Sequence, residues 1–230
     1  MKITHVFFDL DRTLWDFDLN SYNTLLDIFH DFSLKDKGIK DPVFFIEQYI
    51  KINESLWGLY RDDLITKEDL RSRRFYQTLQ EYSIQDLQLA KDIGDAYVKN
   101  SPLQTVLFPH TIEILTYLKK KYSLSIITNG FEEVQHIKLK ASAIDHFFDH
   151  VVTSEAVDVK KPNPIIFQYA LDKAKVSAKS SIMIGDDLPV DILGAKSMGM
   201  SHVFFNPKKN SHSQKIDFEI SCLSDLKNIL

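Results

Sequence analysis

The sequence has 230 residues, of which 44% are hydrophobic and 26% are charged, so it is neither a disordered nor a collagen-like chain. Its 28 basic and 32 acidic side chains leave a net charge of −4, which argues against a protein dedicated to binding nucleic acid. The single cysteine, Cys222, excludes an intrachain disulfide and a cysteine-based zinc site. The length fits one domain, or one domain that carries a large insertion.

The first residues do not have the pattern of a signal peptide, because their apolar run reaches Asp9 too early and no small-residue cleavage site follows. No stretch approaches the roughly 18 apolar residues that a membrane-spanning helix needs. We therefore expect a cytoplasmic protein, a monomer or dimer, with no membrane and no nucleic-acid polymer among its partners.

Five short apolar runs are typical of buried parallel strands, since each is followed by polar residues or glycine. They cover residues 4–8, 124–128, 151–153, 181–184 and 201–205. Between them, apolar residues recur at helical spacing. These are Ile112, Leu115, Leu118 and Tyr122, then Val134, Ile137, Ala141 and Ile144, then Phe167, Ala170, Leu171 and Ala174. Strands that alternate with helices predict an α/β fold, a doubly wound parallel sheet in the order 3-2-1-4-5 or an extended form of it.

Residues 15–101 interrupt this alternation, because they contain no clear strand and many aromatic side chains. Turn-forming residues divide the segment into several helices. We expect an all-helical domain inserted after the first strand, with most of its aromatic residues in a core of its own. The α/β domain then comprises residues 1–14 and 102–230.

Two carboxylates, Asp9 and Asp11, follow the first predicted strand. Ligands bind at this end of the strands in open α/β sheets. Two acids held close together need a cation or a shared proton, and Mg²⁺ is a cation that prefers oxygen ligands. The alternative is that Asp9 caps a loop and Asp11 faces water.

The fourth predicted strand also ends in acids, namely Asp186, Asp187 and Asp191. In the predicted order the first and fourth strands are neighbours, so Asp186 should meet Asp9 and Asp11 around one Mg²⁺ ion. Asp187 and Asp191 could instead act as acids at a helix N-terminus.

Two further segments carry groups that suit a phosphate. The second predicted strand ends in Thr128, Asn129 and Gly130, which offer a hydroxyl and backbone N–H groups to an anion, although Thr128 could also cap the following helix. Lys161 lies after the third strand and could place an ammonium beside a phosphate or a nucleophilic carboxylate. The alternative for Lys161 is a solvated loop charge.

Four sequence segments together resemble the four motifs of the haloacid dehalogenase (HAD) superfamily of phosphohydrolases. They read FFDLDRTL, IITNG, VKKPNP and MIGDDLPVDILGA. The helical insertion occupies the place of the family's type 1 cap. The resemblance implies the family's α/β core and a cap that opens and closes over the site, with hinges near Asp16 and at Ser101-Pro102.

The resemblance also implies a role for each matching residue. Asp9 is then the nucleophile that forms an aspartyl-phosphate, and Asp11 is the general acid and later the general base. Thr128, with the backbone of Asn129 and Gly130, holds the phosphoryl oxygens, and Lys161 screens the charge between nucleophile and phosphate. The Mg²⁺ ligands are Asp9, Asp186 and the backbone carbonyl of Asp11. Asp187 and Asp191 are outer contacts of this site.

The run DRTLWDFD, with the ITNGF turn and the KPNP stretch, is similar to a bacterial pyrimidine 5'-nucleotidase subgroup of the superfamily. The expected substrate is therefore a small phosphate ester, a pyrimidine nucleoside monophosphate. The alternatives are a phosphatase for a sugar phosphate or phosphoglycolate, a phosphomutase, a dehalogenase, and a catalytically idle binding protein that keeps the fold.

Overall fold

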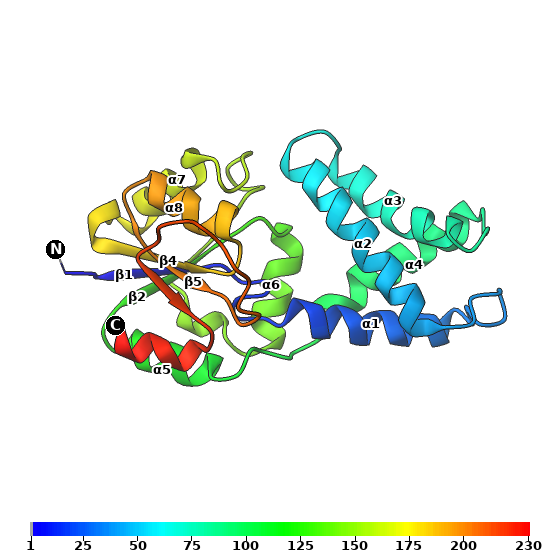
Figure 1. Ribbon diagram of the computed structural model, residues 1–230, viewed down its shortest axis with the longest axis horizontal. Coiled ribbons are helices and arrows are strands. Elements are labelled where there is room, and N and C mark those ends of the chain that lie inside the picture. Colours follow the sequence, from blue (N-terminus) through cyan, green and yellow to red (C-terminus); the bar gives the residue numbers. More distant parts are fainter. Residues whose placement is uncertain (1) are drawn as a thin grey trace. The chain divides into compact units, whose positions relative to one another are not determined.

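The computed structural model describes residues 2–230, and within them six parallel strands form one sheet in the order β3-β2-β1-β4-β5-β6 (Figure 1). The strands are β1 His5–Phe8, β2 Ser123–Thr128, β3 His150–Thr153, β4 Ser181–Gly185, β5 Ser201–Phe205 and β6 Phe218–Ile220. The predicted fold class and strand order are confirmed in the extended form. The sequence did not identify β6, a three-residue strand that pairs only with β5.

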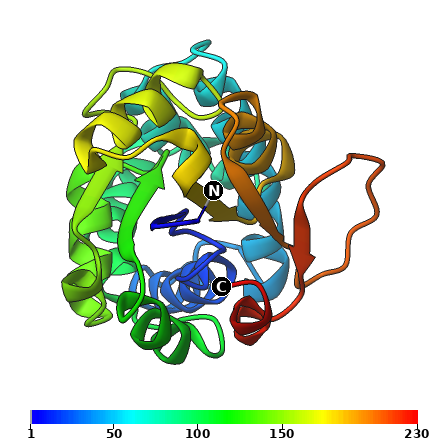
Figure 2. The same ribbon diagram turned by 90° about the vertical axis from the view of Figure 1, so that its left-hand side faces the viewer.

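Helices cover both faces of the sheet (Figure 2). Their bounds are α5 Thr111–Lys119, α6 Glu132–Ala141, α7 Pro164–Ala174 and α8 Leu193–Ser197, with short turns η2 Asp145–Phe147, η3 Ala178–Ser180, η4 Leu188–Ile192 (π-helical) and η5 Leu223–Asn228. Because side chains alternate along a strand, neighbouring residues of β1 serve different cores. Phe8 packs in the cluster that contains Leu115 of α5, whereas Phe7 packs in the cluster that contains Phe167 of α7.

The apolar faces predicted for two helices are partly wrong. In α5 the buried residues include Leu115 and Leu118, as expected, but Ile112 is 47% exposed. In α6, Ile137 is 41% exposed, while the polar residues Gln135 and Lys138 are buried instead. Helix α6 is therefore rotated relative to the expected apolar face, and its polar side chains must have partners inside the protein.

The chain divides into two compact units, the residues up to Phe17 together with Thr105–Leu230, and Asp18–Gln104. The inserted segment contains the helices α1 Phe17–Asp31, α2 Pro42–Arg61, α3 Lys67–Gln80 and α4 Leu87–Asn100, followed by η1 Ser101–Leu103. The Asp18–Gln104 unit has its own core, which includes the rings of Phe29, Phe45, Tyr49, Phe75 and Tyr97. The predicted insertion began at Trp15, but this residue packs in the core of the sheet. That the helical unit acts as a cap stays a prediction.

Three helices of this unit begin with side-chain caps, and in α4 the cap is Asp86, which accepts a hydrogen bond from the backbone N–H of Leu89. Asp41 accepts hydrogen bonds from the backbone N–H groups of Val43 and Phe44 at the start of α2, and Thr66 forms a capping box with Asp69 at the start of α3. Such caps satisfy N–H groups that have no partner within the helix. The breaks between helices thus follow from local sequence.

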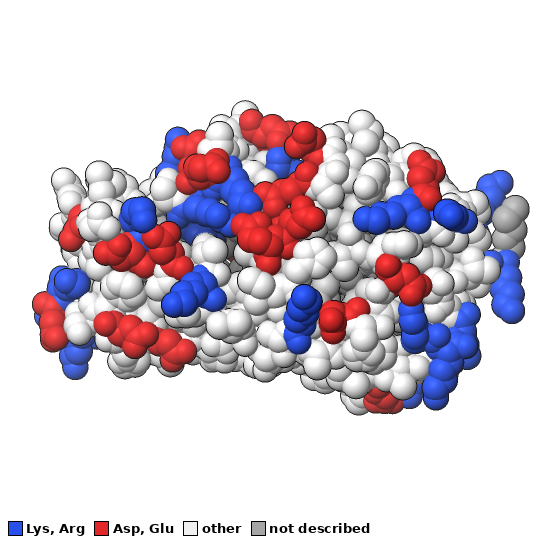
Figure 3. Space-filling model, turned by 180° about the vertical axis from the view of Figure 1, so that it is seen from behind, with Lys and Arg blue, Asp and Glu red and all other residues white. Residues whose placement is uncertain are grey.

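Acidic and basic side chains are interspersed on the face that Figure 3 shows. Among the described residues, no helix combines the length and the apolar character that crossing a membrane requires.

The buried His5 predicts an acid-sensitive fold. Its ring lies 2.9 Å from Ser125 Oγ and is 2% exposed, and burial, against the attraction of Asp149, lowers its pKa from 6.5 to about 4. Between these values the unfolded chain binds a proton that the native state does not, so stability falls as the pH falls from 6.5 towards 4. From pH 7.5 to pH 5, this group alone should cost about 2 kcal/mol of unfolding free energy.

Urea denaturation of the wild-type protein and His5→Gln at both pH values checks this. The wild-type protein should lose about 2 kcal/mol more than the variant on acidification, since the variant lacks the titrating ring. Equal losses would show that His5 does not govern acid sensitivity.

Candidate active site

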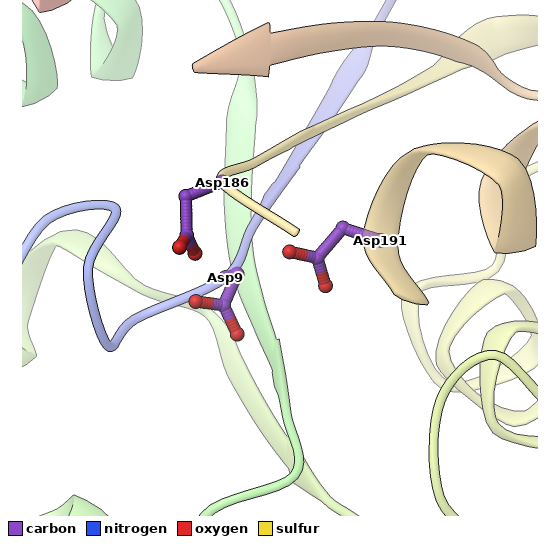
Figure 4. Close-up of side chains that lie close together, drawn as sticks. All are labelled: Asp9, Asp186 and Asp191. Carbon is purple, nitrogen blue, oxygen red and sulfur yellow. The ribbon is translucent and has the colours of Figure 1, made fainter. Parts of the chain in front are cut away.

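The site forms where β1 and β4 end side by side in the sheet. The backbone N–H of Asp9 donates to Ile184 O at 2.9 Å, which continues the β1–β4 ladder by one residue. Asp186 follows Gly185 at the end of β4. Asp9, Asp186 and Asp191 each contribute an oxygen to a group in which these atoms all lie within 4.8 Å of one another (Figure 4).

Asp191 reaches this group because Gly185 leaves room for it. A Cβ atom at position 185 would lie 2.4 Å from Asp191 Oδ2 and 2.6 Å from Asp191 Cγ, closer than atoms can approach. Asp191 Oδ2 also accepts a hydrogen bond from the backbone N–H of Asp187, and Asp187 accepts one from Val190 N–H. Of the two acids suggested for a helix N-terminus, Asp187 has that position, at the start of η4, whereas the side chain of Asp191 points into the site.

Lys161 is the buried cation of the site. Its Nζ atom lies 2.7 Å from each of three oxygens, namely Asp9 Oδ1, Asp191 Oδ1 and Ile127 O. The ammonium donates hydrogen bonds to Asp9 Oδ1 and Ile127 O, and it forms an ion pair with Asp191 Oδ1. Lys161 is 2% exposed, so the alternative of a solvated loop charge is wrong.

The side chain of Asn129 fixes the backbone beside Lys161. Asn129 Oδ1 accepts from Lys161 N–H at 2.8 Å, and Asn129 Nδ2 donates to Lys161 O at 3.0 Å. This pair joins the loop after β2 to the loop after β3. The sequence suggested Asn129 for its backbone, but its side chain has this separate structural task.

Burial and mutual repulsion shift the pKa values of these groups. Burial raises the pKa of Asp9 to about 7 against the attraction of Lys161, and it raises that of Asp186 well above its usual value with the repulsion of Asp9 and Asp191 added. Burial alone would lower the pKa of Lys161, but Asp191 and Asp9 raise it. Lys161 therefore stays charged, whereas burial and mutual repulsion oppose ionisation of the carboxyl groups around it.

Thr13, which the sequence did not indicate, links two of the carboxylates. Its Oγ1 atom lies 3.3 Å from Asp9 Oδ2 and 3.2 Å from Asp186 Oδ1, and the residue is fully buried. The two oxygens of Asp9 thus face different surroundings, since Oδ1 faces Lys161 and Oδ2 faces Thr13. The sequence signal that could have identified Thr13 is its position, four residues after Asp9 in the same short loop.

The side chain of Asp11 turns away from the other acids, towards α6. Asp11 Oδ1 lies 2.5 Å from Lys138 Nζ, and Asp11 Oδ2 accepts from Gln135 Nε2 at 2.8 Å. Gln135 Nε2 also donates to Thr128 Oγ1 at 2.7 Å, and so does the N–H of Gly130 at 3.0 Å. Thr128 is not the N-cap of α6, because Phe131 occupies that position. A metal-ligand role for the backbone carbonyl of Asp11 stays a prediction.

The donor set fits a hard divalent cation. It consists of carboxylate oxygens, which Mg²⁺ prefers, and the excess negative charge on Asp9, Asp186 and Asp191 is what such an ion would offset. Lys161 supplies a single positive charge to Asp9 and Asp191, and the positive charge of Arg12 acts on Asp186 without cancelling the rise in its pKa. Asp9 and Asp186, from adjacent strands, are the residues that would hold the metal.

A pocket of about 240 Å³ opens next to this group, within the same compact unit. Its lining includes Asp186, Asp187, Phe204 and His212. His212 belongs to the loop between β5 and β6, which stands out from the sheet in Figure 2. The site therefore has room for a small organic group beside Asp186.

Comparisons with known proteins identify relatives that match nearly the whole chain. The pyrimidine 5'-nucleotidase YjjG of Escherichia coli is 30% identical over 100% of this chain and 99% of its own length. The pyrimidine 5'-nucleotidase PynA of Streptococcus pneumoniae is 28% identical over 97% of this chain and 95% of its own length. A crystal structure of YfnB from Bacillus subtilis bound to magnesium has a TM-score of 0.88 and 25% identity, and the match covers 100% of this chain and 99% of that one.

A family model described as haloacid dehalogenase-like hydrolase matches residues 6–205, a span that runs from β1 to the end of β5. That span includes all four segments that carry the site. The protein therefore belongs to the haloacid dehalogenase-like hydrolase family.

Proposed function

We propose that this hydrolase is a Mg²⁺-dependent phosphomonoesterase that works through an aspartyl-phosphate on Asp9. The observation that carries the proposal is the contact between Asp9 Oδ1 and Lys161 Nζ, inside a group of carboxylates at the end of the sheet. A buried carboxylate held by an ammonium is suited to attack an electrophile that itself carries negative charge.

In the first step a carboxylate oxygen of Asp9 attacks phosphorus. The bond from phosphorus to the ester oxygen breaks, and Asp11 gives its proton to that oxygen, so an alcohol leaves. Lys161 offsets the repulsion between the carboxylate and the phosphate, while Thr128 and the backbone N–H groups near Gly130 hold phosphoryl oxygens. Mg²⁺, when bound, would neutralise charge on the phosphoryl group in the transition state.

In the second step a water molecule attacks phosphorus of the aspartyl-phosphate. Asp11, now a carboxylate, takes a proton from this water, and the bond between phosphorus and Asp9 breaks. Inorganic phosphate leaves and both aspartates return to their starting forms. The same residue serves as acid and then as base, which requires a fixed position close to the reacting oxygen.

For the substrate we propose a pyrimidine nucleoside monophosphate. The support is the similarity to YjjG and PynA over nearly the whole chain. The competing substrates are sugar phosphates and phosphoglycolate, and a phosphomutase or a dehalogenase would use related residues. Of the two phenylalanines beside the site loops, Phe131 is only 6% exposed, and the ring of Phe17 lies 4.9 Å from the Arg12 guanidinium.

Activity measurements test this proposal directly. The wild-type protein should release phosphate from an aryl phosphate with Mg²⁺ and lose this activity with a chelator. Asp9→Asn should lower kcat by a factor of about 10⁴ or more, since the nucleophile is gone. Across a panel, pyrimidine nucleoside monophosphates should give a higher kcat/KM than sugar phosphates.

Equal rates across sugar phosphates, with no gain from a pyrimidine, would refute the substrate assignment but not the phosphatase. Full activity in Asp9→Asn would refute the aspartyl-phosphate. Release of halide from a haloacid, with no hydrolysis of phosphate esters, would assign the chain to the dehalogenase branch.

Thermal unfolding tests the metal assignment without turnover. With chelator, Asp186→Asn should raise the unfolding free energy by about 1 kcal/mol or more, because it removes a buried charge whose raised pKa records its cost. With Mg²⁺, the wild-type protein should gain stability and the variant should not, because it lacks the ligand.

Asp36→Asn serves as a control with the same change in net charge, since Asp36 is exposed in a loop of the helical unit. It should leave both measurements unchanged. Equal stabilisation of the wild-type protein and Asp186→Asn by Mg²⁺ would remove Asp186 from the metal site.

A further inference from the structure

Helix α6 buries two polar side chains on the face that it presents to the protein interior. Gln135 is 0% exposed and Lys138 is 4% exposed, whereas Ile137 between them is 41% exposed. Burying a charge and an amide is costly unless each has specific partners. The partners here are Asp11 and Thr128, two residues to which the proposed reaction gives direct roles.

Lys138 holds one oxygen of Asp11. Its Nζ atom lies 2.5 Å from Asp11 Oδ1 and 4.3 Å from the centre of the Trp15 ring. The ring restricts the ammonium from one side by a cation–π contact, and Trp15 itself is fully buried. The position of the ammonium is therefore set by packing, and through it the direction of the Asp11 side chain.

Gln135 holds the other oxygen of Asp11 and the hydroxyl of Thr128. Its Nε2 atom contacts Asp11 Oδ2 at 2.8 Å and Thr128 Oγ1 at 2.7 Å. In the ionised form of Asp11, which is the base of the second step, both oxygens only accept hydrogen bonds, so the NH₂ end of the amide faces it. Both N–H donors of Gln135 are thereby used within the site.

The hydroxyl of Thr128 then has one direction left for its own hydrogen. It accepts from Gln135 Nε2 and from Gly130 N–H at 3.0 Å, which occupies both oxygen lone pairs. Its O–H is left to donate to a third group. A phosphoryl oxygen, which only accepts, is the matching partner.

Gly130 makes room for this arrangement. A Cβ atom at position 130 would lie 2.0 Å from Gln135 Nε2 and 2.5 Å from Gln135 Cδ, so any other residue would displace the amide. The lack of a side chain at Gly130 therefore allows Gln135 to reach Thr128.

We propose that Lys138 and Gln135 are positioning residues, which together hold Asp11 for proton transfer and the Thr128 hydroxyl for phosphate binding. The inference deepens the proposed function and rests on it. Neither residue touches the substrate in this scheme, because each acts through the group that it holds.

The leaving group of the substrate provides a sharp test for Lys138. A nucleoside 5'-monophosphate releases an alcohol and needs a proton from Asp11, whereas 4-nitrophenyl phosphate releases a stable phenolate and does not. Because kcat/KM reports the steps up to the first bond cleavage, Lys138→Met should lower it about 30- to 100-fold for the nucleotide. For 4-nitrophenyl phosphate the loss should stay within about threefold.

Two further variants separate positioning from folding. Lys138→Arg keeps the charge and should restore nucleotide hydrolysis to within about tenfold of the wild-type value. Lys140→Met removes an exposed lysine from the same helix and should change neither substrate. Equal losses on both substrates in Lys138→Met would overturn the inference, whereas a wild-type protein inactive on both esters would overturn the proposed function.

Gln135 is tested by binding rather than by turnover. Titration calorimetry with inorganic phosphate in the presence of Mg²⁺ should give a Kd about tenfold higher for Gln135→Met than for the wild-type protein, because the Thr128 hydroxyl is no longer directed. Lys138→Met, which leaves Thr128 in place, should bind phosphate within about threefold of the wild-type protein. An unchanged Kd in Gln135→Met would overturn its part of the inference.

Discussion

The ammonium of Lys161 is the interaction on which the site depends. Its three partners are the carboxylates of Asp9 and Asp191 and the backbone oxygen of Ile127, each at 2.7 Å. They come from the end of β1, from the turn after β4 and from β2, while Lys161 itself follows β3. A buried charge is tolerated only where opposite charges and polar groups surround it, so loss of either carboxylate would leave the Lys161 ammonium with uncompensated charge. The ion pair between Asp9 and Lys161 therefore requires that these four chain segments meet at one edge of the sheet.

The same site gathers more carboxyl groups than cations, and this arrangement is a cost to the fold. The pKa values of Asp9 and Asp186 are raised because burial and neighbouring carboxylates oppose ionisation. A protein selected for stability alone would replace one of these acids, since functional sites commonly lower stability. Under the proposed function their presence at adjacent strand ends has an explanation, because a bound divalent cation would offset their charge.

Sequence reasoning located the groups that depend on strand ends, because the carboxyl ends of parallel strands meet at one edge. Asp9 and Asp186 were placed together by that rule alone. The inward turn of Asp191 depends on the clearance that Gly185 leaves, which is a three-dimensional property. The short edge strand β6 was missed because three residues give too little alternation to recognise.

The misjudged face of α6 shows the limit of apolar periodicity most clearly. The pattern favoured Ile137 as a core residue, yet the neighbouring Lys138 occupies the interior, because an ion pair with Asp11 and the face of Trp15 compensate its burial. Leu139, the next residue, packs into the core beneath the sheet. One helix is thus anchored in the core by Leu139, while its Lys138 contacts the loop that carries Asp11. A rotation of α6 that buried Ile137 would remove Leu139 from the core and Lys138 from Asp11. The packing of this helix and the position of the Asp11 side chain therefore depend on each other.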